Sequence, residues 1–157
     1  MDDGTTRIVD ALYASRGQAT VTLEKLGTWA ELLARNDIDH LSDVWSLTER
    51  VLESLPSWGI SVMLGSLLQQ MRNNHSDRNG VVPTHFSQKT SLVNALTTLN
   101  VSQARVKRWG QLLRKQDSST VGDVWSWTDS MFSKLHTVAS FPILLVSFLD
   151  QIRQHRR

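Results

Sequence analysis

One twenty-residue pattern occurs twice in this chain, at an interval of eighty positions. Residues 29–48 read WAELLARNDIDHLSDVWSLT, and residues 109–128 read WGQLLRKQDSSTVGDVWSWT. Nine of the twenty positions are identical, and they include the unbroken run DVWS at 43–46 and 123–126. Because unrelated helices would not keep identical residues in the same order, the chain contains an internal repeat.

The repeat extends beyond these segments in both directions. After a one-residue insertion, residues 64–72 match residues 145–153, with two leucines, a glutamine and an arginine in common. Upstream, IVDAL at 8–12 corresponds to LVNAL at 92–96. The segment between the copies is rich in turn-forming residues and lacks helical periodicity. We therefore predict a first domain at 1–73, a linker at 74–87 and a second domain at 88–157.

Apolar residues follow helical spacing throughout both copies, and no segment alternates like a strand. The pattern predicts an all-α fold made of two tandem five-helix bundles. The helices are expected at 6–15, 21–35, 39–45, 47–55 and 59–73, and again at 88–98, 101–116, 119–125, 127–136 and 140–155. Ser46 with Glu49, and Ser126 with Asp129, are interpreted as capping boxes that begin the fourth helix of each copy.

The residue types and their spacing give no indication of catalysis, metal binding or phosphate binding. The chain has no cysteine, and none of its five histidines (His40, His75, His85, His136 and His155) has a partner at metal-ligand spacing. Its glycines form no phosphate-binding loop. We therefore expect no catalytic residue, cofactor or metal site, and a protein that is not an enzyme.

The sequence also bears on membranes and location. The longest apolar run, residues 141–149, is too short to cross a bilayer, which needs about 20 residues. Asp2 and Asp3 precede any apolar stretch, which is unlike a secretory signal. The expectation is a cytoplasmic protein, with the nucleus as the alternative, and no association with a membrane or a small-molecule substrate.

Residues 29–49 resemble the sterile alpha motif (SAM) domain. That family has an aromatic residue, an Asn-x-Ile-Asp turn, here residues 36–39, and a Leu-Thr-acidic helix start, here residues 47–49. Residues 55–60, LPSWGI, stand where the family has Leu-Gly-Ile. The chain departs from the family at the start of the last helix, where it has GISVM at 59–63 and ASFP at 139–142 in place of a Gly-His-Arg or Gly-Lys-Arg run. Death-fold domains fit the spacing less well.

The resemblance implies SAM-like bundles that act in protein–protein interaction, commonly through an acidic middle surface and the N-terminus of the last helix. The residues that would supply the acidic surface are Asp37, Asp39, Asp43 and Glu49. Trp58 and Phe141 lie near the start of the last helix of each copy, and both are candidate exposed anchors. The tryptophans at equivalent repeat positions, Trp29, Trp45, Trp109 and Trp125, are instead expected in the core.

Charge distinguishes the two copies. Residues 1–78 hold seven Lys and Arg against eleven Asp and Glu, whereas residues 79–157 hold ten against four. The candidate basic surface consists of Arg105, Lys107, Arg108, Arg114 and Lys115. These cations are compatible with a plain solvated helix face, with docking to an acidic helical partner, or with binding of a nucleic-acid backbone. We expect an adaptor or oligomerisation module whose partner is another SAM-like domain or itself, with RNA or DNA binding by the basic copy as the alternative.

Overall fold

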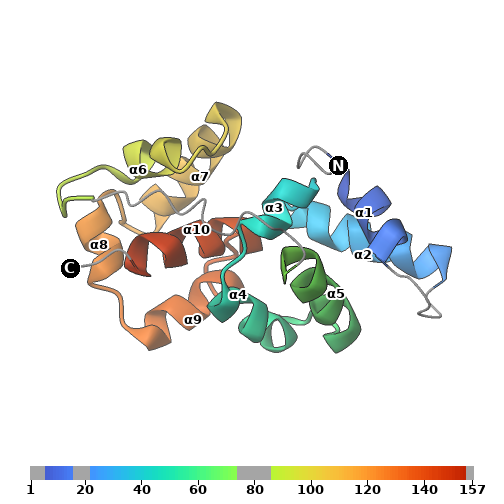
Figure 1. Cartoon of the computed structure of the whole chain (residues 1–157). Coiled ribbons are helices and arrows are strands. Elements are labelled where there is room, and N and C mark those ends of the chain that lie inside the picture. The colour runs from blue at the N-terminus through green and yellow to red at the C-terminus, as the bar shows by residue number, and fades with distance from the viewer. Residues whose placement is uncertain (1–5, 16–21, 74–85, 155–157) are drawn as a thin grey trace. The chain divides into compact units, whose positions relative to one another are not determined.

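The computed structural model describes residues 6–15, 22–73 and 86–154, and its regular structure in those ranges is entirely helical (Figure 1). The elements in chain order are α1 (Ile8–Ser15), α2 (Leu23–Arg35), α3 (Leu41–Trp45), α4 (Glu49–Ser54), the 3₁₀ helix η1 (Leu55–Trp58), α5 (Val62–Asn73), α6 (Leu92–Thr98), α7 (Gln103–Lys115), α8 (Val121–Trp125), α9 (Asp129–Thr137) and α10 (Ile143–Gln154). The all-α prediction is confirmed.

The chain divides into two compact units. Unit 1 comprises residues 1–80 with residues 142–144, and unit 2 comprises residues 81–141 with residues 145–157. Most of the predicted linker, residues 74–85, lies outside the described ranges, as do His75, His85 and His155. The two-bundle arrangement and its boundaries stay predictions.

The lengths of the helices follow the sequence repeat. Helices α2 and α7 each have 13 residues and begin eighty positions apart. Helices α3 and α8 each have five residues at the same interval. Helices α5 and α10 each have 12 residues, 81 positions apart, as the one-residue insertion requires. These three pairs of helices therefore agree in length, whereas α4 has six residues and α9 has nine.

Each unit buries the apolar stripes of its helices. In unit 1, α1 packs along α2, and α5 packs against α1, α3, α4 and η1 (Figure 1). In unit 2, α6 packs on α7, and the Trp109 and Phe148 rings of α7 and α10 lie 5.9 Å apart. The Trp125 indole N–H donates to the Ile152 carbonyl at 3.0 Å. Trp29 and Trp109 are buried as predicted, whereas Trp45 and Trp125 are only half-buried.

A carboxylate holds the turn before α3 and before α8. Asp43 Oδ2 accepts hydrogen bonds from the Asp39 and His40 backbone N–H groups at 2.9 and 3.1 Å. Asp123 Oδ2 accepts equivalent bonds from Ser119 and Thr120 at 2.9 and 3.0 Å. These two arrangements are called the Asp clamps below. The backbone bonds from Ser119 and Thr120 lower the pKa of Asp123 below its usual value.

The clamped turns attach the first helix of each unit. The Ile8 N–H donates to the Asp39 carbonyl and the Leu41 N–H donates to Thr6, both at 2.8 Å. In unit 2, the Leu92 N–H donates to Ser119 at 2.9 Å and the Val121 N–H to Thr90 at 2.8 Å. The Asp clamp therefore positions the segment to which the N-terminus of α1 or α6 is bonded.

Several helices end in a left-handed residue that reverses the chain. The described residues with positive φ are Asp37, Gly59, Asn100, Asp117 and Ser140. After each one, the next residue donates its N–H to a carbonyl five or six positions earlier, as in Ile38 to Leu33 and Phe141 to Leu135. Such helix ends bring an apolar residue back against the helix. Ile38 and Phe141 are both buried in this way.

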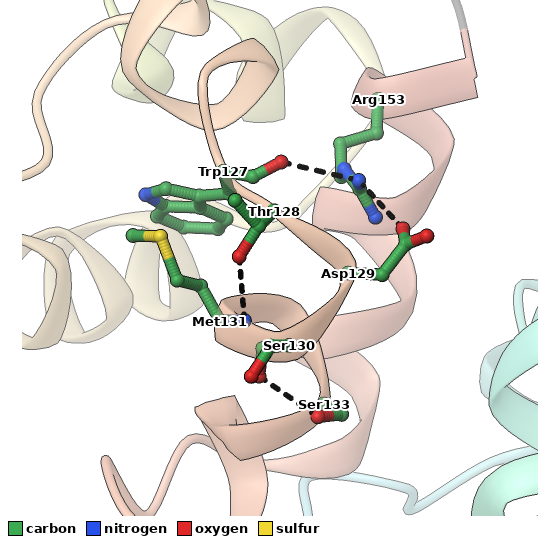
Figure 2. A network of polar contacts seen from close by, with 7 residues as sticks. All are labelled: Trp127, Thr128, Asp129, Ser130, Met131, Ser133 and Arg153. Carbon is green, nitrogen blue, oxygen red and sulfur yellow. Dashed lines mark hydrogen bonds and ion pairs between the residues drawn. The ribbon is translucent and has the colours of Figure 1, made fainter.

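The predicted capping boxes of the fourth helices are wrong, because the N-cap residue of each helix lies two positions later in the sequence. Thr48, not Ser46, caps α4 through its Oγ1, which accepts the Val51 N–H at 3.3 Å. Thr128 caps α9 in the same way by accepting the Met131 N–H at 3.1 Å (Figure 2). Ser46 and Ser126 instead close the last turns of α3 and α8, because their backbone N–H groups bond to the carbonyls of Asp43 and Asp123.

Arg153 ties α10 to the start of α9. Its Nη2 donates to the Trp127 carbonyl at 3.2 Å and to the Asp129 carboxylate at 3.0 Å (Figure 2). The guanidinium also lies 5.0 Å from the centre of the Phe132 ring. Because the Arg153 side chain is 17% exposed and that of Asp129 is 78% exposed, the carbonyl and ring contacts contribute more than the ion pair does.

Candidate functional site

The predicted basic surface lies on α7. Lys107, Arg108, Arg114 and Lys115 are exposed, and Arg105 is half-buried. The opposite face of the helix carries its buried residues, Val106, Trp109, Gly110 and Leu113. At about 100° per residue, the four exposed cations fall within one sector of the helix circumference. The name "α7 basic face" is used below for Lys107, Arg108, Arg114 and Lys115.

No acidic residue occurs anywhere in α7. Among the residues that the structure describes, no carboxylate pairs with Lys107, Arg114 or Lys115. The equivalent face of α2 is different: it carries Glu31 and Arg35, whose side chains form an ion pair at 3.2 Å. One scaffold position is therefore charge-balanced in unit 1 and uniformly positive in unit 2.

The residues of the predicted acidic surface are partly used in holding the fold. Asp43 is 8% exposed, and its carboxylate is engaged in the Asp clamp. Asp37 is buried in the left-handed turn after α2, and Asp39 is half-buried. Glu49, in the first turn of α4, is exposed. Glu49 is therefore the one predicted carboxylate of the four that is exposed and accessible to a cationic partner.

The structure separates the two candidate aromatic anchors. Phe141 is 1% exposed, because it follows the left-handed Ser140 and folds back against the end of α9. Its expected role as an exposed anchor does not agree with this burial. Trp58 is half-buried at the end of η1, which packs against α5.

Two exposed apolar side chains follow Trp58 closely in the sequence. Val62 and Met63, in the first turn of α5, are 74% and 51% exposed. Their neighbours later in the helix, Leu64, Leu67, Leu68 and Met71, are buried. Apolar spacing predicts that Val62 belongs to the same buried stripe, and its exposure shows that this prediction is wrong. Trp58, Val62 and Met63 are called the apolar corner below.

A shallow hollow of about 490 Å³ lies on unit 1. Its lining residues are Arg7, Ile8, Ala30, Glu31, Ala34, Asp39 and His40. The hollow is open to solvent and its charged residues have both signs. Two of its lining residues, Asp39 and His40, belong to the turn that the Asp clamp holds. The arrangement lacks the enclosed apolar walls that binding of a small molecule favours.

The residues that the structure describes contain no cluster of three or more His, Cys, Asp or Glu residues placed to hold a metal ion. His136 bonds through Nδ1 to the Phe141 carbonyl at 2.8 Å and so belongs to the turn before α10. None of the described helices has the length and apolar character needed to span a bilayer.

Comparison with protein-family models, with curated proteins and with solved structures finds no match.

Proposed function

We propose that this chain is a non-enzymatic protein-interaction module made of two SAM-like units, and that the apolar corner of unit 1 is its docking surface. The resemblance of residues 29–49 to SAM domains supports the proposal, since that family is known for protein–protein interaction. The observation that carries it is the exposure of Val62 and Met63 at 74% and 51%.

The apolar corner has the chemistry of an interface centre. Single exposed apolar residues are normal on protein surfaces, but adjacent ones beside an aromatic side chain are typical of a binding patch. Trp58 supplies the residue type most enriched among binding hot spots. The first turn of α5 and the end of η1 present these side chains from packed elements, so little backbone ordering is needed on docking.

The simplest occupant is a second copy of the chain, which makes the module oligomerise. Because Trp58, Val62 and Met63 carry no charge, apolar contact is the expected driving force of self-association at this corner. Such association should weaken little with added salt.

Sedimentation velocity at rising protein concentration tests this proposal. We expect the wild-type chain to associate, and Val62→Glu to shift the midpoint of association at least tenfold upward, because a charge would be desolvated in the contact. Val138→Glu is the matched control, since Val138 is 73% exposed outside the corner. A Val62→Glu chain that associates like the wild type would contradict docking at the corner. A wild type that stays monomeric would exclude self-association and require a different protein as partner.

A further inference from the structure

A second surface has a chemistry that protein docking at the apolar corner does not use. The α7 basic face combines four exposed cations with a helix that contains no acid. Because a cluster of exposed cations attracts negative charge, the occupant for which this face is suited is a polyanion.

The cations lie in two rows along the helix. Lys107 and Arg114 form one row and Arg108 and Lys115 the other, since residues seven apart lie nearly in line on an α-helix, about 10 Å from each other. The uncharged Gln111 lies between the rows and is exposed. The face is thus a polar ridge with positive charge on both flanks.

This geometry fits duplex DNA. An α-helix with its side chains is about 10–12 Å across, and the major groove of B-DNA is about 12 Å wide with phosphates on both margins. Duplex RNA has a deep, narrow major groove that does not admit a helix. Single strands are bound by stacking on aromatic side chains, and Trp109, the aromatic residue of α7, is buried.

We infer that the α7 basic face binds the phosphate backbone of duplex DNA, with the two rows of cations on the two margins of the major groove. The contacts are to phosphates, so binding is independent of base sequence and sensitive to salt. With about four phosphate contacts, the logarithm of the binding constant falls with the logarithm of salt concentration with a slope of about −3.6. Affinity then drops about a hundredfold between 50 and 200 mM salt.

The test is fluorescence anisotropy of a labelled 20-base-pair DNA duplex titrated with the full chain at 50 to 200 mM salt. Lys107→Ala and Lys115→Ala each remove a charge from one row, and each is expected to weaken binding about five- to tenfold at 50 mM and to reduce the slope by about 1. Lys134→Ala, an exposed lysine on α9 of the same unit, is the matched control and should change the affinity less than twofold. Circular dichroism shows whether each variant keeps its helices.

Several results would overturn the inference. One is an equal loss of affinity in Lys134→Ala and Lys107→Ala, which would indicate attraction by net charge alone. Another is absence of binding at 50 mM salt with about 100 μM protein, because non-specific dissociation constants of about 1–100 μM at physiological salt become smaller at this lower salt concentration. Tighter binding of duplex RNA, of a single strand or of polyglutamate would show that the face serves another polyanion. Because Val62 is on unit 1, Val62→Glu should leave DNA binding unchanged, so this inference and the proposed function fail independently.

Discussion

Asp43 and Asp123 each use one carboxylate oxygen to accept two backbone N–H groups in the turn that begins a short helix. Both lie in the DVWS run that recurs unchanged in the sequence. Recurrence of Asp at this position therefore has a structural cause, because a carboxylate satisfies two N–H groups that the short helix leaves unpaired. The identity of the two runs therefore indicates a structural role for Asp43 and not the predicted role in an acidic docking surface.

Replacement of Asp123 by Asn should make stability less dependent on pH below 4. Backbone hydrogen bonds lower the pKa of folded Asp123 below 3.8, so its ionised form stabilises the fold above that pH, and the stabilisation is lost as pH falls through the folded-state pKa. The Asn side chain keeps one accepting oxygen but does not titrate. The check is the thermal midpoint between pH 5 and 2.5 for both proteins. If the thermal midpoint of Asp123→Asn depended on pH as strongly as that of the wild type, the ionised Asp123 carboxylate would not stabilise the fold as described.

At the scale of the helix, the N-caps of α4 and α9 can be tested by comparing the two threonine hydroxyls that cap them with the two serine hydroxyls predicted to do so. Thr48→Ala and Thr128→Ala should each lower the free energy of unfolding by about 1 kcal/mol, because each removes the acceptor of a helix N-terminal N–H. Ser46→Ala and Ser126→Ala should cost less than about 0.5 kcal/mol, since these hydroxyls donate to carbonyls at helix ends. Urea unfolding measures all four; larger losses in the serine variants would restore the capping boxes predicted from sequence.

The sequence predicts the helices better than their ends. Apolar periodicity and the repeat predict the order and class of the elements, because burial of one stripe per helix is a property of the pattern itself. The start of α4 is less predictable, since Ser46 and Thr48 both match the preference for N-caps. The choice depends on Ser46 N–H bonding back to Asp43, which continues α3 into its last turn.

The candidate sites show the same division. The α7 basic face is predictable because charges opposite an apolar stripe are exposed on any packed helix. The burial of Phe141 is not predictable from sequence, because it depends on Ser140 adopting a left-handed φ of 60°. Such a φ is uncommon for a residue with a Cβ. Unit 1 has Gly59 at the corresponding place, and there the sequence indicates the turn directly.

At the scale of the whole chain, the two units share the Asp clamps and the lengths of three equivalent helices, but they differ in their surfaces. Unit 1 exposes apolar side chains at the start of α5, and unit 2 exposes cations along α7. Because the shared residues hold the fold, they are the part that duplication keeps. Some buried positions also differ, as Leu47 and Trp127 do, but the proposed functions rest on differing residues that are exposed to solvent.

Site-specific photo-crosslinking tests most directly whether the chain works by docking at the apolar corner. A photoreactive residue replaces Met63 in one full-length chain and Val138 in another, and each is irradiated both as purified protein and in native extract. We predict a discrete, saturable adduct at position 63, either a dimer of the chain or a conjugate with one protein, and no such adduct at position 138. Equal labelling at both positions, or no adduct at position 63 under either condition, would contradict the account.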